Sequence, residues 1–155
     1  MTGADLLNTT ISQVSRSIRE RQLSPVELTQ ACIEQSERVD PMLKAFTTMT
    51  PEYAIQRAQQ AEKEISSGKY RGPLHGIPYT LKDVIATQGI RTTFGNPRMI
   101  DFKPQESATV HVLLEEAGAV LLGKVYSHIG RGDNPVMCYS PWDPDTSPGT
   151  TSGGS

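Results

Sequence analysis

The sequence predicts an α/β fold in which helices pack on a mixed β-sheet. Three observations support this prediction. Apolar side chains recur at helical spacing through the first seventy residues. Two short apolar runs, Ile77–Leu81 and Ala119–Leu122, are typical of buried strands. A helical pattern over 108–117 lies between them, and a strand–helix–strand order with short connections indicates parallel pairing.

Residues 1–70 are predicted to be a helical N-terminal region that serves as scaffold. The first helix is indicated by apolar residues at helical spacing, namely Ile11, Val14, Ile18 and Leu23. Ser24–Glu27 (SPVE) then signals the start of a second helix, with a serine cap, a proline at the first helical position and a glutamate that closes a capping box. We expect this helix to end at Asp40-Pro41.

A short β-type run at 45–49 precedes the third helix, which is predicted to begin at Thr50-Pro51 and to stop near Gly68. Ser107 is predicted to cap the helix over 108–117, and Gly123-Lys124 to end the second strand. Residues 129–155 have little periodicity and are rich in Gly, Pro, Asp and Ser. Residues 1–70 and 71–155 are thus two consecutive regions of the chain.

Composition excludes several classes of function. The net charge of −2 gives no basic surface for nucleic acid and no polybasic patch for a membrane. The two cysteines, Cys32 and Cys138, have neither metal-site spacing nor the density of a disulfide scaffold. No secretory leader and no run of membrane-spanning length is evident. We therefore expect a cytoplasmic protein with no metal or cofactor.

One lysine and a cluster of hydroxyl residues indicate possible chemistry. Lys82 ends the segment GPLHGIPYTLKD (72–83), and Thr150, Thr151, Ser152 and Ser155 lie in the glycine-spaced segment PGTTSGGS (148–155). A neutral lysine can accept a proton from a hydroxyl, as in Ser/Lys catalysis. The alternatives are a solvated strand-end lysine paired with Asp83, and a flexible Gly/Ser linker. His75 and His128 are predicted to be structural.

Four ordered segments carry a resemblance to a known family. They are GPLHGIPYTLKD (72–83), TQGIRTTFGN (87–96), AGAVLLGK (117–124) and PWDPDTSPGTTSGGS (141–155). Their order and spacing resemble the amidase signature family, and the N-terminal helices are similar to that family's opening. The resemblance implies the N-terminal part of the amidase signature fold, since family members are roughly three times this length. It implies that residues 1–155 are the N-terminal portion of a single domain, with 71–155 as the first half of its signature core.

The resemblance also implies roles for single residues. Lys82 matches the catalytic lysine of the family's Ser-cisSer-Lys triad. Thr151 lies at the position of the cis-serine, where threonine keeps the hydroxyl but adds a methyl group. Ser152 and Ser155 match two further serines of that loop and are alternatives. The family's acylating serine follows a couple of dozen residues later, so we expect residues 1–155 alone to be inactive.

Two functions are compatible with these patterns. In the first, the chain is part of an amide hydrolase acting on a small-molecule amide, either a general amidase or the A subunit of a tRNA-dependent amidotransferase. In the second, it is a non-catalytic remnant or a binding module derived from an amidase. The sequence does not indicate an oligomeric state. The first function requires Lys82 to project toward the loop at 150–155.

Overall fold

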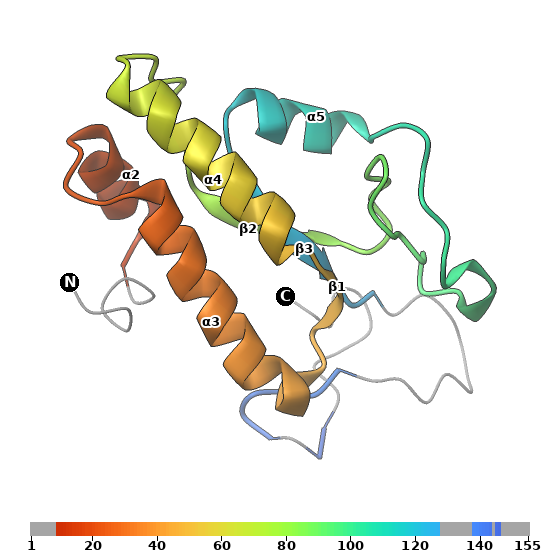
Figure 1. Ribbon diagram of the computed structural model, residues 1–155. Helices are drawn as coiled ribbons and strands as arrows, with labels where there is room; N and C mark the ends of the chain where they lie inside the picture. Colours follow the sequence, from red (N-terminus) through yellow and green to blue (C-terminus); the bar gives the residue numbers. More distant parts are fainter. Residues whose placement is uncertain (1–8, 128–137, 144, 147–155) are drawn as a thin grey trace. The chain divides into compact units, whose positions relative to one another are not determined.

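The computed structural model describes residues 9–127, 138–143 and 145–146 of the chain. Two helices open the described chain, and strands and helices follow in turn (Figure 1). In order they are α2 (Ile11–Arg19), α3 (Pro25–Leu43), β1 (Phe46–Met49), α4 (Pro51–Ser66), β2 (Pro78–Lys82), the 3₁₀ helix η1 (Pro97–Met99), α5 (Thr109–Glu116) and β3 (Val120–Val125).

The N-terminal helices begin where side-chain caps are available. At α2, the Thr10 hydroxyl accepts a hydrogen bond from the Gln13 backbone N–H, and the Gln13 side chain accepts one from the Thr10 N–H. At α3, Ser24 Oγ accepts from the N–H groups of Val26 at 3.0 Å and Glu27 at 3.3 Å. These bonds satisfy donors that a helix start leaves open, as expected for the Ser24 cap.

The end of α3 differs from the prediction. The helix continues through Pro41 and ends at Leu43, three residues beyond Asp40. Proline is costly inside a helix because it removes one backbone hydrogen bond, and here only two residues of the helix follow Pro41. The chain leaves the helix at Lys44, which has a left-handed φ of 51°, and the Lys44 N–H donates to the Asp40 carbonyl at 2.7 Å.

The three described strands form one sheet in the order β1-β3-β2. Strand β1 pairs with β3 in the antiparallel sense, with Phe46 opposite Val125 and an irregularity before Thr48. Gly123 of β3 permits this approach, because a Cβ there would lie 2.3 Å from the Thr48 carbonyl oxygen. Strand β3 therefore extends past Gly123-Lys124, where the sequence pattern predicted its end.

Strands β2 and β3 run in the same direction. The Val120 N–H donates to the Ile77 carbonyl at 2.9 Å, and the Asp83 N–H donates to the Val125 carbonyl at 2.9 Å. Partner numbers thus increase together along both strands, as in a parallel pair. The predicted α/β class, the mixed sheet and the shared sheet of the two apolar runs are confirmed.

The chain divides into two compact units. Unit one comprises Met1–Ser36, Thr50–Tyr79 and Val112–Leu122, and unit two comprises Glu37–Met49, Thr80–His111 and Gly123–Ser155. In unit one, α3 and α4 lie beside β3 (Figure 1) and bury one apolar cluster, made of Ile33, Ala54, Ala58, Val120 and Leu122. A second cluster comprises Val14, Ile18, Leu23, Leu28, Ile65 and Ile77.

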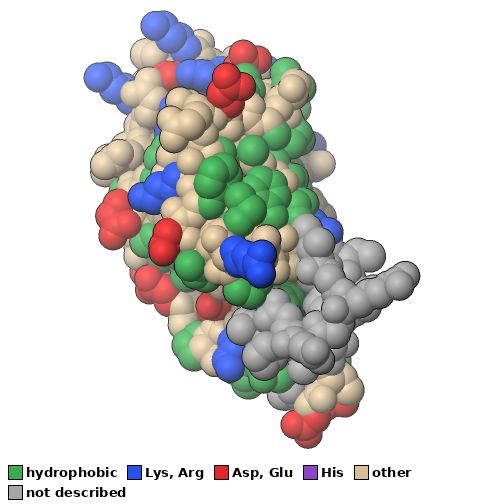
Figure 2. Space-filling view, turned by 90° about the vertical axis from the view of Figure 1, so that its right-hand side faces the viewer, with side chains coloured by type: hydrophobic (Ala, Val, Ile, Leu, Met, Phe, Trp, Pro, Cys, Tyr) green, Lys and Arg blue, Asp and Glu red, His purple; other side chains and the backbone are tan. Residues whose placement is uncertain are grey.

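Helix α5 leaves much of its apolar surface exposed. Val110 is 47% exposed and Leu113 is 58% exposed. The face presented in Figure 2 has hydrophobic side chains gathered near its middle. None of the helices in the described ranges is both long enough and apolar enough to cross a membrane.

Candidate functional site

Lys82 is the last residue of β2, at one edge of the described sheet, and is half-buried. The Ile85 N–H donates to the Lys82 carbonyl at 3.0 Å, so the chain turns directly after this residue. No described residue forms a hydrogen bond or an ion pair with Nζ of Lys82.

Asp83 is fully buried and has partners other than Lys82. Its carboxylate accepts hydrogen bonds from the backbone N–H of Thr93 at 3.2 Å and from the Thr93 hydroxyl. The Phe94 N–H donates to the Asp83 carbonyl at 2.9 Å. Buried carboxylates need such donors. Asp83 therefore anchors the loop around Thr93, and the alternative in which it pairs with Lys82 is not supported.

A second lysine, Lys124, is the buried one. It lies in β3, is 0% exposed, and donates hydrogen bonds from Nζ to the Ile85 carbonyl, to Thr87 Oγ1 at 3.1 Å and to Thr92 Oγ1 at 3.0 Å. Burial lowers the pKa of Lys124 to about 8, although the negative charge of Asp83 acts in the opposite direction. Lys124 thus joins β3 to the segment that follows Lys82.

Sequence reasoning missed this role for Lys124, which it treated only as a strand end. The available signal was the position of a lysine directly after the apolar run Ala119–Leu122 and a glycine. A cation at the end of a buried strand requires oxygen partners. The threonines in TQGIRTT (87–93) supply two of them.

Unit two also contains an open cavity of about 550 Å³. It is lined by side chains from the end of α3, from β1, from the loop at 91–100 and from the residues after β3, namely Asp40, Pro41, Lys44, Phe46, Thr47, Arg91, Thr93, Gly95, Asn96, Pro97, Ile100, Tyr126 and Ser127. Thr93 lines the cavity and donates a hydrogen bond to Asp83, the residue that follows Lys82 in the sequence. Lys82 itself is not among the lining residues.

The hydroxyl residues of the predicted site lie outside the described residues. This applies to Thr151, Ser152 and Ser155, and also to Thr150 and His128. The approach of Lys82 to Thr151 stays a prediction. Within the described ranges, no group of three or more His, Cys, Asp or Glu side chains is placed to hold a metal ion.

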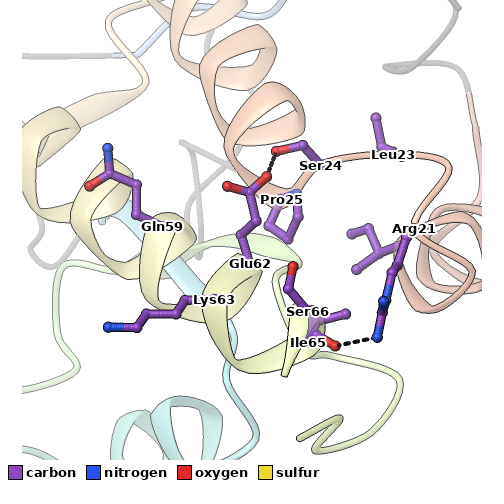
Figure 3. Close-up of a pocket in the computed structure, with 10 residues that line it drawn as sticks. Arg21, Leu23, Ser24, Pro25, Gln59, Glu62, Lys63, Ile65 and Ser66 are labelled. Carbon is purple, nitrogen blue, oxygen red and sulfur yellow. Dashed lines mark hydrogen bonds between the residues drawn. The ribbon is translucent and has the colours of Figure 1, made fainter. Parts of the chain in front are cut away.

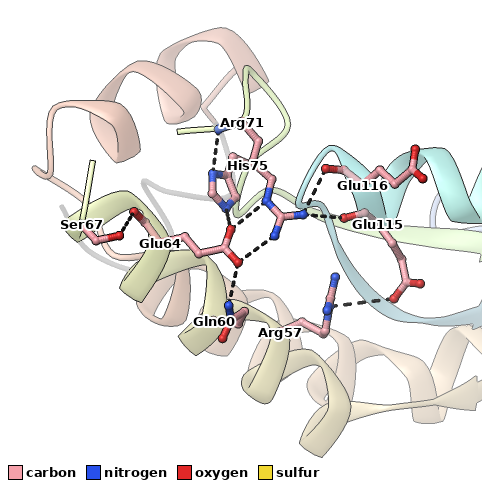
Figure 4. Close-up of polar contacts among 8 residues, drawn as sticks. All are labelled: Arg57, Gln60, Glu64, Ser67, Arg71, His75, Glu115 and Glu116. Atoms are coloured by element: carbon pink, nitrogen blue, oxygen red, sulfur yellow. Dashed lines mark hydrogen bonds and ion pairs between the residues drawn. The ribbon is translucent and has the colours of Figure 1, made fainter. Parts of the chain in front are cut away.

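Unit one holds a polar cluster with a different character (Figure 4). Arg71 forms two hydrogen bonds of 2.7 Å to the carboxylate of Glu64 and one of 3.1 Å to the Glu116 carbonyl at the end of α5. His75, 1% exposed, accepts from the Arg71 N–H at Nδ1, and its Nε2 lies 3.3 Å from Glu64. Because Nδ1 accepts a hydrogen bond, a neutral His75 carries its proton on Nε2, the nitrogen next to Glu64.

The charges of this cluster are mutually satisfied. Hydrogen bonding to Arg71 lowers the pKa of Glu64 to about 2, and burial lowers the pKa of His75. Gly118 packs against the imidazole so closely that a Cβ there would lie 2.3 Å from His75 Cδ2. This arrangement joins α4, the loop before β2 and the end of α5, in agreement with the predicted structural role of His75.

A hollow of about 330 Å³ in unit one offers no comparable chemistry (Figure 3). It lies between the start of α3 and the end of α4. The Ser24 hydroxyl donates to Glu62, and Arg21 donates to the Ile65 carbonyl at 3.4 Å. Because these polar side chains pair with groups of the hollow itself, we assign no ligand to it.

Comparison with known proteins gives a consistent result. The family model described as Amidase matches residues 27–155. The chain is 41% identical to the A subunit of the glutamyl-tRNA(Gln) amidotransferase of Dehalococcoides mccartyi (strain CBDB1) over 157 residues, covering 97% of this chain and 32% of that protein. It is 36% identical to a putative amidase AmiD of Mycobacterium bovis, covering 93% of this chain and 31% of that protein.

A solved structure extends the comparison to three dimensions. The native peptide amidase from Stenotrophomonas maltophilia superposes with a TM-score of 0.87 at 30% identity, covering 95% of this chain and 33% of that one. The chain therefore spans about a third of the length of the relatives it matches.

Proposed function

Because this chain belongs to the amidase family, we propose that it forms the part of an amide hydrolase that carries the catalytic lysine, Lys82. The observation that carries the proposal is the state of the two neighbours Lys82 and Asp83. Asp83 is occupied by Thr93, whereas Nζ of Lys82 has no partner among the described residues. Because successive side chains of a strand alternate between its two faces, the buried Asp83 is not a natural partner of Lys82, and Nζ is open to a hydroxyl partner.

The proposed mechanism is of the Ser-cisSer-Lys type. An acylating serine adds to the amide carbon, its proton moves to the hydroxyl at position 151, and the proton of that hydroxyl moves to the neutral amine of Lys82. The relay then returns a proton to the leaving nitrogen as the C–N bond breaks. Water finally hydrolyses the ester. Thr151 is the proposed relay hydroxyl, with Ser152 and Ser155 as alternatives.

We propose further that residues 1–155 do not hydrolyse amides by themselves. Their described part contains the lysine and its supporting loop, and the chain spans about a third of the length of the relatives it matches. The family resemblance implies that the acylating serine and the oxyanion donors follow this segment. Oxyanion stabilisation alone contributes several kcal/mol to such reactions, on the order of 3 kcal/mol per donor. The alternative is a non-catalytic remnant or binding module.

The two classes of relative suggest two amide substrates. The relative at 41% identity is named as part of an amidotransferase, whereas the solved structure at 30% identity is named as a peptide amidase. We propose a small-molecule amide as substrate in either case, without nucleic acid contact by this segment, because its net charge is −2. We also propose a cytoplasmic location, since Cys32 and Cys138 are free thiols.

A chimera tests the proposal. Residues 1–155 are fused to the part of the Stenotrophomonas maltophilia peptide amidase that follows its matching third, and ammonia release is measured from glutamine and from peptide amides. We expect turnover by the chimera, none by residues 1–155 alone, and a loss of at least 100-fold in the Lys82→Ala chimera. Lys69→Ala, at an exposed lysine, is the matched control.

Each result has a defined meaning. Full activity of the Lys82→Ala chimera would contradict the catalytic assignment of Lys82. Turnover by residues 1–155 alone would contradict the proposed inactivity and would direct attention to Ser152 and Ser155 as nucleophiles. A chimera that folds but never turns over would favour the remnant.

A further inference from the structure

The cavity of unit two has the size and the lining of a small-molecule site. Its volume of about 550 Å³ falls within the range of roughly 300–1,000 Å³ that is typical of ligand pockets. Most of its wall is apolar, formed by Pro41, Phe46, Pro97, Ile100 and Tyr126. A few polar groups interrupt this wall, and a site of this composition selects an apolar body with a small polar end.

One of these polar groups is a buried hydroxyl without a partner. Ser127 is 1% exposed, and its Oγ has no hydrogen-bond partner among the described residues. Buried hydroxyls are almost always hydrogen-bonded, since an unsatisfied one is unfavourable. A ligand atom that can form a hydrogen bond in the cavity would remove this cost, so Ser127 indicates where the polar end of a ligand binds.

The second polar group is a guanidinium held in place by β1. Arg91 Nε donates to Thr48 Oγ1 at 2.9 Å, and Arg91 Nη2 donates to the Thr47 carbonyl. These bonds use two of the five donors of an arginine side chain. Because the remaining donors belong to a group that is already fixed, they can bind an acceptor with little further loss of side-chain entropy.

The charges around the cavity favour a ligand with an acceptor end. Arg91 and Lys44 are cationic, whereas Asp40 is the one carboxylate among the lining residues. Asp40 is already engaged, since it accepts a hydrogen bond from the Phe46 N–H at 2.9 Å. Lys44 lies over the ring of Tyr139, 5.4 Å from its centroid. A carbonyl oxygen therefore fits the cavity better than an ammonium group does.

We infer that this cavity binds a small aromatic carboxamide, with the ring against the apolar wall and the carboxamide at Ser127. This inference rests on the proposed function, because it names aromatic amides as the substrate class. The link to Lys82 is Thr93, which lines the cavity and is held by the carboxylate of Asp83. Ser127 and Ile100 are then specificity residues of the site.

Binding is measured on the 155-residue chain itself, so the test does not need turnover. A ¹⁵N-labelled sample is titrated with phenylacetamide, and saturable shifts are expected at the backbone amides of Thr93, Gly95 and Ser127. Ethylbenzene, which lacks the carboxamide, is expected to bind about tenfold more weakly because Ser127 stays unpaired. Phenylacetate binding more tightly than phenylacetamide would overturn the assignment to carboxamides.

Two variants test the wall and the polar end separately. Ser127→Ala is expected to weaken phenylacetamide binding about fivefold to tenfold and to leave ethylbenzene binding unchanged. Ile100→Ala, at a residue that is 52% exposed, is expected to weaken both ligands several-fold without loss of the fold. Unchanged phenylacetamide affinity in both variants would overturn the inference, and the exposed Ile100 keeps the test valid if Ser127→Ala fails to fold.

Matched controls lie outside the cavity. Thr29→Val removes another buried hydroxyl without a partner among the described residues, in unit one, and Val110→Ala shortens an exposed apolar side chain that does not line the cavity. Both are expected to leave the affinity unchanged. Equal weakening by the controls and by the cavity variants would overturn the site.

The same variants in the chimera separate this inference from the hydrolase proposal. Ser127→Ala should raise KM about fivefold to tenfold for phenylacetamide and for glutamine, because both present a carboxamide, whereas Ile100→Ala should raise KM several-fold for phenylacetamide only. Turnover of phenylacetamide that is insensitive to Ser127→Ala would overturn the cavity as the substrate site and leave the hydrolase intact. Ser127-dependent binding in a chimera without turnover would overturn the hydrolase and leave the cavity as a binding site.

Discussion

The polar cluster of unit one and the surroundings of Lys82 in unit two differ in how completely their groups are paired. Glu64, Arg71 and His75 bond to one another and to backbone groups. In unit two, Nζ of Lys82 and the buried Ser127 hydroxyl have no partner among the described residues, and Ser127 lines the cavity. Completed pairing is typical of a scaffold, whereas an open buried group in a cavity indicates a place for a ligand.

Lys124 is a scaffold lysine of unit two, and its replacement is expected to cause the largest loss of stability. Lys124→Ala should lower the free energy of unfolding by about 3–5 kcal/mol, because it removes a buried side chain and leaves Thr87, Thr92 and the Ile85 carbonyl without their donor. Urea denaturation of the 155-residue chain measures this. Lys82→Ala is the comparison, with an expected loss below about 1 kcal/mol.

Equal losses in these two variants would erase the distinction between the structural lysine and the proposed catalytic lysine. If Lys124→Ala does not fold, Lys124→Met keeps most of the side-chain volume and permits the same comparison.

The pH dependence of stability sharpens the assignment of Lys124. Its pKa is lowered to about 8 in the folded chain, against an ordinary value of 10.5. Between these values the unfolded chain binds more protons than the folded chain, so the contribution of Lys124 makes stability rise with pH in this window. Lys124→Met should remove that rise in urea denaturation at pH 8, 9 and 10. An identical slope in both proteins would contradict the burial of a titrating lysine.

In unit one, the contact between Gly118 and His75 is expected to give the next effect. Gly118→Ala should cost about 2–4 kcal/mol, because the new Cβ meets the imidazole and Gly118 has a positive φ of 80°. Gly89→Ala is the matched control, since Gly89 has a φ of 72° but open space around it. The difference in stability loss between the two variants measures the cost of the contact with His75. Equal losses would show that the His75 side chain moves aside at little cost in free energy.

Glu64 tests the electrostatics of the same cluster. Glu64→Gln should lower stability at pH 7 by about 2 kcal/mol, because it removes a charged acceptor of Arg71. The pKa of Glu64 is about 2, against 4.5 ordinarily, so its contribution is present above pH 4.5 and is lost as the pH falls toward 2. Glu34→Gln, at an exposed helical glutamate bonded to Gln30, is the control and should have little effect.

The smallest effect is expected at the exposed face of α5. Leu113→Ala should change stability by less than about 0.5 kcal/mol, because the side chain is 58% exposed, whereas Leu121→Ala should cost about 2–5 kcal/mol at a residue that is 1% exposed. Thermal melts compare the two variants. A large loss at Leu113 would indicate that a further part of the chain covers this face.

The sequence by itself determined the class of fold, the order of its elements and the position of Lys82. These features are local: helix caps such as Ser24, the spacing of apolar residues, and the segment 72–83 with its family resemblance. Helix α3 shows the limit of such signals. Pro41 predicts a break at Asp40, but the helix tolerates the loss of one backbone hydrogen bond in its last turn and continues to Leu43.

Only the tertiary structure decided which charged groups are paired. Asp83 lies next to Lys82 in sequence but bonds to Thr93, ten residues away, and Lys124 finds its partners at residues 85, 87 and 92. The cavity likewise combines the end of α3, β1 and the loop at 91–100. The physical reason is that burial and hydrogen-bond partners depend on which segments the sheet brings together, whereas sequence patterns record mainly the spacing along one segment.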